Sequence, residues 1–141
     1  LKMDKLTQKT LVAGFLYHQD KVLLLRRVSS KTFLPDFYER PGGHQEVDED
    51  LETAIIREFL EETGLSIIVG SQYFEYTHPI DETQYTEYSF FVKAQEDPIS
   101  ISLSSEHSKY VWVDKNELDQ YKIDPNEKRA ILEGFENIGS Y

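Results

Sequence analysis

The stretch GHQEVDEDLETAIIREFLEETGL, residues 43–65, decides the fold because it contains an acidic helix with a marked beginning and end. Asp48–Asp50 supplies candidate N-cap residues, and acidic residues crowd the first turn, where the helix dipole favours them. Gly64 is the usual type of residue to end a helix. The pattern therefore predicts a helix that runs from about Asp50 to Thr63.

The glutamates near the end of this helix lie on the same side as its apolar residues. At about 100° per residue, the apolar side of the helical wheel, which holds Leu51 and Ile55, also holds Glu58, Glu61 and Glu62. A solvated run of charges would lie opposite an apolar stripe. We therefore expect the three carboxylates to face a cleft. The alternative is an amphipathic helix whose last glutamates turn outward.

Three carboxylates at positions i, i+3 and i+4 repel one another in a cleft of low dielectric constant. A hard divalent cation removes this repulsion, and Mg²⁺ and Mn²⁺ prefer oxygen ligands. Zinc fits less well, because the sequence has no cysteine and no histidine pair at ligand spacing. Gly42-Gly43 would let the backbone approach a metal or a phosphate closely, with an ordinary turn as the alternative. The sequence thus predicts an Mg²⁺ or Mn²⁺ site at Glu58, Glu61 and Glu62.

The same segment resembles the signature of the Nudix hydrolases. That signature is a glycine, five free positions, a glutamate, seven free positions, and then Arg-Glu-aliphatic-x-Glu-Glu-x-Gly-aliphatic. The fixed positions are occupied at the required spacing by Gly43, Glu49, Arg57, Glu58, Glu61, Glu62, Gly64 and Leu65. Phe59 departs from the pattern, because it places an aromatic ring at an aliphatic position. Softer similarities to the family lie at Val22–Arg27, at Tyr38-Glu39 before Pro-Gly-Gly, and at Trp112–Leu118.

The resemblance implies a Nudix-type α/β/α sandwich with a mixed β-sheet, in which the box at residues 43–65 forms a loop–helix–loop. It also implies the hydrolysis, assisted by Mg²⁺ or Mn²⁺, of a nucleoside diphosphate that is linked to another group. By the same resemblance, Glu58, Glu61 and Glu62 would be the metal ligands, with the Gly42 carbonyl as an additional one.

Two further roles are implied by the resemblance. Arg57 is similar to the family arginine that pairs with the earlier glutamate, here Glu49, and a guanidinium fork suits this task because it binds carboxylates through two hydrogen bonds. Glu106, in the loop before Trp112, resembles a family glutamate that serves as a metal ligand or a base, with a solvated loop residue as the alternative. The candidate catalytic residues are therefore Glu49, Arg57, Glu58, Glu61 and Glu106.

The chain on the N-terminal side of the box predicts strands. Thr10–His18 and Lys21–Arg27 are expected to form a hairpin, although the turn between them lacks glycine. Ser29–Asp36 is expected to be a loop. Phe37–Arg40 is expected to be a short strand that ends at the turn Pro41-Gly42-Gly43.

The chain on the C-terminal side predicts more strands and then helices. The expected strands are Leu65–Val69, Tyr73–Thr77, Tyr85–Ala94 and Tyr110–Val113. The expected helices are Asp114–Tyr121 and Asn126–Ile138. Strands around a central helix, followed by a helical C-terminus, predict an α/β fold on a mixed sheet, in a single domain of residues 1–141.

The distribution of charge suits a small anionic partner. The net charge of −11 should repel nucleic acid. Between Lys21 and Arg40 there are five basic and two acidic residues, whereas the segment Glu46–Glu62 has eight carboxylates and one arginine. A basic segment beside an acidic one fits an anion held partly by divalent cations, with ordinary variation in surface charge as the alternative. Candidate phosphate contacts are Arg26, Arg27 and Arg40.

The composition excludes several classes of protein. The absence of cysteine excludes disulfides, thiolate metal sites and cysteine nucleophiles. No apolar run approaches the roughly 18 residues that span a bilayer, and the N-terminus lacks the apolar stretch of a signal peptide. We therefore expect a cytoplasmic protein with a small-molecule nucleotide substrate and no nucleic-acid or membrane partner. Association into a homodimer is left open.

The identity of the substrate depends on residues outside the box. By elimination, a nucleoside triphosphate, including an oxidised one, is the first expectation, and ADP-ribose or another nucleoside diphosphate derivative is the second. Pro79 and Tyr85 lie close to positions that mark two of the subfamilies, but neither matches in spacing. A module that senses nucleotides without hydrolysing them is the alternative of a different class. Such modules usually lose box glutamates, and none is lost here.

Overall fold

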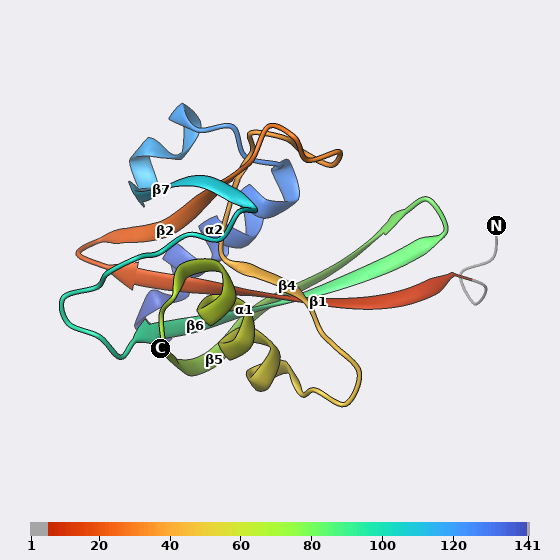
Figure 1. The fold of residues 1–141 in the computed structure, drawn as a ribbon, viewed down its shortest axis with the longest axis horizontal. Helices are drawn as coiled ribbons and strands as arrows, with labels where there is room; N and C mark the ends of the chain where they lie inside the picture. Colours follow the sequence, from red (N-terminus) through yellow and green to blue (C-terminus); the bar gives the residue numbers. More distant parts are fainter. Residues whose placement is uncertain (1–5, 141) are drawn as a thin grey trace.

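The computed structural model describes residues 6–140 and shows a mixed sheet with helices on both faces (Figure 1). This confirms the predicted α/β/α sandwich; the remaining residues of the predicted domain 1–141 lie outside the described part. The strands are β1 (Thr7–His18), β2 (Lys21–Arg27), β3 (Tyr38–Glu39), β4 (Gly42–His44), β5 (Ile67–Ile80), β6 (Thr83–Ala94) and β7 (His107–Asp114). The α-helices are α1 (Leu51–Thr63) and α2 (Pro125–Asn137), accompanied by short 3₁₀ helices at Lys115–Gln120 and Ile138–Ser140.

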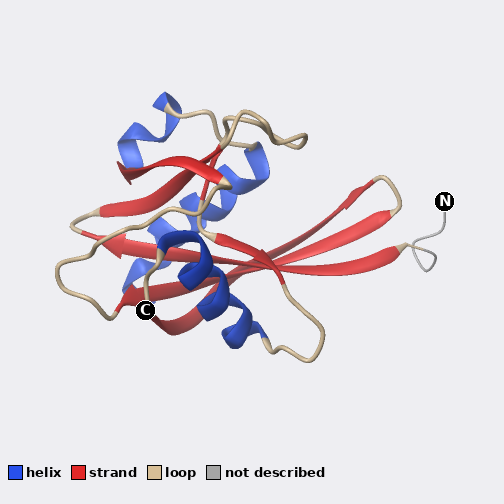
Figure 2. Cartoon of the chain, in the orientation of Figure 1, coloured by secondary structure: helices blue, strands red, loops and turns tan. Residues whose placement is uncertain are grey.

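Strand β1 organises the sheet because it changes its partner along its length (Figure 2). Its middle residues, Leu11–Ala13, pair with β4 and its last residues, Tyr17 and His18, pair with β2, while β6 runs parallel to it from Thr7–Thr83 to Leu16–Val92. The sheet order is β3-β2-β1-β6-β5, with β7 added on β2. The segment Tyr38–His44 therefore crosses from β2 to β1, and this crossing carries the Gly-Gly pair.

Alternate side chains of β1 enter two separate cores. Val12 and Leu16 pack with Phe59 of α1, whereas Phe15 packs with Ile131 of α2. Because successive side chains of a strand point to opposite faces, the two helices cover opposite faces of the sheet. Within residues 6–140, no helix is long and apolar enough to cross a bilayer.

The ends of α1 are those that the sequence predicts. The Asp50 carboxylate accepts a hydrogen bond from the Thr53 N–H at 2.7 Å, as an N-cap residue does. Gly64 adopts the left-handed conformation, with φ of 73°, and its N–H donates to the Leu60 carbonyl. The hairpin of β1 and β2 is also confirmed. Gln19 and Asp20 both have positive φ, which gives the turn the geometry that glycine usually supplies.

The prediction of two separate strands at Leu65–Val69 and Tyr73–Thr77 is wrong. A single strand, β5, runs through both, and its register against β6 shifts on either side of Gln72. The sequence around Gly70 resembles a loop because a β-bulge uses the same small and polar residues.

Two other local predictions are also wrong. Gly42-Gly43 is a strand that pairs with β1 rather than a turn, and a Cβ atom on Gly42 would overlap the Val12 carbonyl. The expected helix Asp114–Tyr121 is a 3₁₀ helix, Lys115–Gln120, which Asp114 and Glu117 close in a capping box. Six residues give too few hydrogen bonds to favour an α-helix.

The packing of α2 leads to a prediction about Gly134. A Cβ atom at Gly134 would overlap the Phe15 ring, whereas one at Gly139 would meet no atom within 4 Å. Gly134→Ala should therefore lower the free energy of unfolding by about 1–3 kcal/mol, even though alanine is the better helix former. Gly139→Ala should change it by less than about 0.5 kcal/mol. Thermal denaturation of both variants checks this, and equal melting temperatures would contradict it.

Candidate active site

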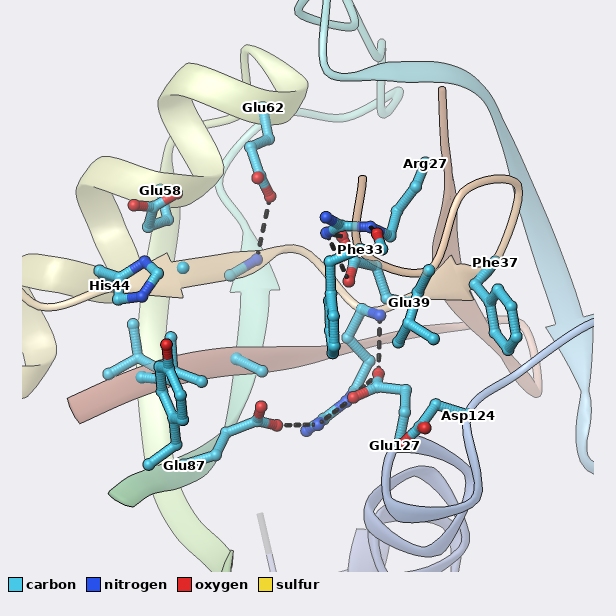
Figure 3. A pocket seen from close by; sticks show the side chains of 18 of the residues that line it. Arg27, Phe33, Phe37, Glu39, His44, Glu58, Glu62, Glu87, Asp124 and Glu127 are labelled. Carbon is cyan, nitrogen blue, oxygen red and sulfur yellow. Dashed lines mark hydrogen bonds and ion pairs between the residues drawn. The ribbon is translucent and has the colours of Figure 1, made fainter. Parts of the chain in front are cut away.

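A cleft of about 940 Å³ lies where α1, β4 and the β5–β6 hairpin meet the loop after β2 and the start of α2. Figure 3 shows Glu58 and Glu62 on one side of it and Phe33, Phe37 and Asp124 on the other. The predicted site residues that line it are Arg27, Arg40, Gly42, Arg57, Glu58, Glu61, Glu62 and Glu106. Arg26 and Glu49 are not among the lining residues.

The glutamates of α1 face the cleft, as the helical wheel predicts, but to different depths. Glu62 is 5% exposed, and its carboxylate accepts the Gly42 N–H at 3.0 Å (Figure 3). The Glu58 side chain is 12% exposed and lies against Gly43, where a Cβ atom would come within 2.5 Å of the carboxyl carbon. A larger residue at Gly43 would displace this carboxylate from its position. Glu61 lies at the rim, with its side chain 57% exposed.

At the end of the cleft formed by α1, burial makes the ionised forms of the glutamates unfavourable. The pKa of Glu62 is raised to about 9, mainly by burial. The hydrogen bond from the Gly42 N–H lowers this pKa, whereas the negative charges of Glu39, Glu58 and Glu106 raise it. Burial also raises the pKa of Glu58, in opposition to Arg57. The cleft thus contains oxygen ligands that lack a sufficient counter-charge.

Arg57 is the cation that holds these carboxylates in place. Its guanidinium grips Glu49 through two bonds, Nε to Oε2 at 2.6 Å and Nη2 to Oε1 at 2.8 Å, so the predicted pair is confirmed. Its Nη1 reaches Glu58 at 2.9 Å and Glu61 at 3.4 Å, and Nη2 also donates to the His44 carbonyl. The hydrogen bond from Arg57 lowers the pKa of Glu49 to about 2, which keeps the pair ionised.

The donor set fits a hard divalent cation. Glu58, Glu61 and Glu62 offer only carboxylate oxygens, and the absence of a side chain at Gly43 leaves room for the Glu58 carboxylate against β4. Among residues 6–140, no three acidic or histidine side chains already converge closely enough to hold an ion. Arg57 contacts two of the three glutamates in this structure, so a cation would have to take over that neutralisation.

Glu106 joins the site from the loop before β7. It lines the cleft with its side chain 55% exposed, and Lys31 contacts it at 3.0 Å and lowers its pKa. Sequence reasoning missed Lys31 as a site residue, although it belongs to the basic segment between Lys21 and Arg40.

Arg26 and Arg27 point in different directions because they are neighbours on one strand. Arg27 lines the cleft, where Nε donates to the Phe33 carbonyl at 3.0 Å and Nη1 contacts Glu39 at 3.1 Å. Arg26 lies away from the lining residues and pairs with Asp36 at 3.1 Å. Of the two, only Arg27 is placed to meet a ligand in the cleft.

Arg40 lies beneath the cleft, in a buried network. Its side chain is 0% exposed and donates to Glu127 at 2.8 Å, to Ser89 at 2.7 Å, to Tyr73 at 3.0 Å and to Glu87 at 2.5 Å. Its hydrogen-bond donors are thus committed to α2, β5 and β6, and the structure gives Arg40 a structural place rather than the predicted phosphate contact. An arginine that directly follows a short strand gives no sign in sequence of whether it will be buried.

The comparisons with known proteins agree with this geometry. A family model described as the NUDIX domain matches residues 8–135. The chain belongs to the Nudix family. The m7GpppN-mRNA hydrolase NUDT17 of Danio rerio is 53% identical to this Nudix domain over 47 residues, which are 33% of this chain and 16% of that protein. The human protein of the same name is 42% identical over 60 residues, which are 42% of this chain and 18% of that protein. The matches thus span less than a fifth of these relatives.

Solved structures resemble this Nudix domain over almost its whole length. The MutT protein from Methanosarcina mazei has a TM-score of 0.80 at 24% identity and covers 97% of this chain and 99% of its own. The E. coli ORF135 protein has a TM-score of 0.80 at 20% identity, with 99% and 97% covered. At these identities the likeness concerns the fold.

The geometry of Arg57 predicts a coupling with Glu49. Arg57→Lys should reduce kcat, because an ammonium cannot make both hydrogen bonds to Glu49, and Glu49→Gln should cause a comparable loss. In the double variant the losses should be much less than additive, since both changes break one interaction. KM should change less than kcat, because what is lost is the position of Glu58 and Glu61. Steady-state kinetics of the four proteins measures this, and strictly additive losses would show that the residues act independently.

Proposed function

We propose that this Nudix domain is a divalent-metal-dependent hydrolase that cleaves the diphosphate linkage of a nucleoside diphosphate derivative. The observation that carries the proposal is that Glu58, Glu61 and Glu62 all line one cleft, in a box with every fixed glutamate present. Carboxylates that are buried at the cleft and only partly neutralised by Arg57 are unfavourable for folding alone, which supports a role in binding cations.

The names of similar proteins support the substrate class. They mention capped mRNA, ADP-ribose, Ap4A and UDP-X, and each of these contains a nucleoside joined to phosphate groups. Within this class, a nucleoside triphosphate, including an oxidised one, is our first candidate. ADP-ribose or another nucleoside diphosphate derivative is the second. A small-molecule nucleotide partner and a cytoplasmic location belong to the same proposal.

The residues divide the chemistry among them. Glu58, Glu61 and Glu62, with the Gly42 carbonyl, would hold Mg²⁺ or Mn²⁺, which when bound supplies charge neutralisation at phosphate oxygens and acidifies a coordinated water. Arg57 and Glu49 fix the position of the carboxylates. Glu106 is ionised, because Lys31 lowers its pKa, and its carboxylate can accept a proton or a hydrogen bond at the cleft. Arg27 and Lys31 supply positive charge for the phosphates.

The test of the proposal is a panel of nucleotides with Mg²⁺ and Mn²⁺, scored for release of phosphate or pyrophosphate. Glu61→Gln and Glu62→Gln should each reduce turnover by orders of magnitude while the protein stays folded. Glu52→Gln, a matched change in the exposed first turn of α1, should leave turnover unchanged. Full activity in excess chelator would overturn the proposal.

The two arginines of β2 form a second test. Arg27→Ala should raise KM by about tenfold or more, because charge-assisted hydrogen bonds contribute about 1.5–3 kcal/mol. Arg26→Ala removes the same charge outside the cleft and should leave KM within about twofold. Initial rates over a range of substrate concentrations decide between them. An equal effect of both variants would mean that overall charge, rather than the position of Arg27, governs binding.

A further inference from the structure

Four aromatic side chains form a continuous row along the cleft, which we call the aromatic row. They are His44 on β4, Tyr76 and His78 on β5, and Tyr85 on β6, and all four line the cleft. The ring centroids of Tyr76 and His78 lie 5.5 Å apart with planes at 18°, and those of His78 and Tyr85 lie 6.1 Å apart at 28°. The rings of Tyr85 and His44 meet edge to face, with centroids 6.1 Å apart.

The pairing of the strands explains why these rings share one face of the sheet. Tyr85 lies opposite His78, Tyr76 lies opposite Glu87, and Leu11 lies opposite His44. Partners in adjacent strands point their side chains the same way. This is the face that α2 covers farther along the strands, but the ends of β5, β6 and β1 extend beyond both helices (Figure 1).

Packing does not account for the row. Tyr76, His78 and Tyr85 are only partly buried, His44 is exposed, and none of the four belongs to either hydrophobic core. Phe15, on the same face of the sheet, is by contrast fully buried under α2. Nδ1 of His78 is buried without a hydrogen-bond partner among the described residues, which costs free energy rather than stabilising the fold.

Strand β4 connects the row to the carboxylates. Gly43 and His44 are consecutive, so they face opposite sides of the strand: Gly43 lies against Glu58, and His44 lies against Tyr85. Arg57 donates to the His44 carbonyl at 2.9 Å and so ties this point of β4 to the box helix. Figure 3 shows the His44 ring and the Glu58 carboxylate on either side of the β4 ribbon. Because Glu58 and all four rings line the same cleft, a ligand whose phosphates lie near Glu58 can extend past the edge of β4 toward the row.

We propose that the aromatic row is the subsite that stacks the planar base of the nucleotide substrate. This rests on the proposed function, because it is the binding of the substrate phosphates near Glu58 that brings the attached base to the row. Nucleobases stack on aromatic side chains with little dependence on their identity, and offset or edge-to-face contacts are favourable. Phe33 and Phe37, on the opposite side of the cleft, are the competing location for the base.

The test uses the fluorescent nucleotide 2-aminopurine riboside 5′-diphosphate, with a methylene group in place of the bridging oxygen so that it is not hydrolysed. Stacking on an aromatic ring quenches its emission, so a titration in Mg²⁺ reports both the affinity and the stacking. Methylenediphosphonate, which has the same phosphorus groups and no base, serves as the competitor. Its inhibition constant reports on the phosphate end alone.

The variants separate the row from the rest of the cleft. Tyr85→Leu combined with His78→Leu should abolish most of the quenching and raise Kd by about tenfold or more, given what a stacked base contributes to binding. The constant for methylenediphosphonate should stay the same. Tyr85→Phe should bind like the unmodified protein. Tyr110→Leu makes the same change at an exposed tyrosine of β7 outside the cleft and should have no effect. Circular dichroism melting establishes that each variant is folded, and the single variants replace the double one if it is not.

The outcomes distinguish this inference from the proposed function. Unchanged quenching and affinity in the double variant would overturn it, as would a loss confined to Phe33→Leu. If the row variants lose the base while the unmodified protein hydrolyses none of the natural nucleotides, the stacking subsite stands and the proposed function fails. If hydrolysis proceeds in the row variants with unchanged KM, the reverse holds.

Discussion

The excess of negative charge at one end of the cleft is the constraint on which the rest of the site depends. On the inner side of α1, Glu62 is buried and Glu58 is partly buried, and burial raises the pKa of each. Arg57 contacts Glu49, Glu58 and Glu61 at the same time, so its guanidinium must be held in one orientation. The two hydrogen bonds that Arg57 donates to Glu49 fix that orientation, because a guanidinium that binds a carboxylate through two hydrogen bonds cannot rotate freely.

The fold supplies the space that this arrangement needs. Strand β1 exchanges β4 for β2 along its length, and the crossing segment brings Gly42 and Gly43 against α1. A larger residue at Gly43 would displace the Glu58 carboxylate, and one at Gly42 would clash with the backbone of β1. The backbone N–H of Gly42 donates a hydrogen bond to the buried Glu62 carboxylate, which replaces one that water would make. The same short strand thus forms the metal end of the cleft on one side and presents His44 to the aromatic row on the other.

A second buried network supports the floor of the cleft. Arg40 joins Glu127 of α2 to Glu87 of β6, and the pKa of Glu87 rises to about 7, because burial outweighs the attraction of Arg40. Replacing one partner of such a network would leave a buried charge without compensation. The network therefore fixes the start of α2, which contains Glu127, against the sheet. The aromatic row lies beyond this end of the helix and lines the cleft.

By itself, the sequence determined the box helix, its caps, the direction of its glutamates, the Arg57–Glu49 pair and the sandwich fold. The helix, its caps and the direction of its glutamates follow from helical periodicity among residues close together in the chain, whereas the pair and the sandwich follow from the resemblance of the box to the Nudix signature. The tertiary structure alone decided that Arg27 faces the cleft, that Arg26 faces away and that Arg40 is buried, since the three look alike in sequence. It also decided that β4 is a strand and that residues from β4, β5 and β6 form one row of rings. Such relations depend on strand register between segments far apart in the chain, and local pattern carries no information about register across such distances.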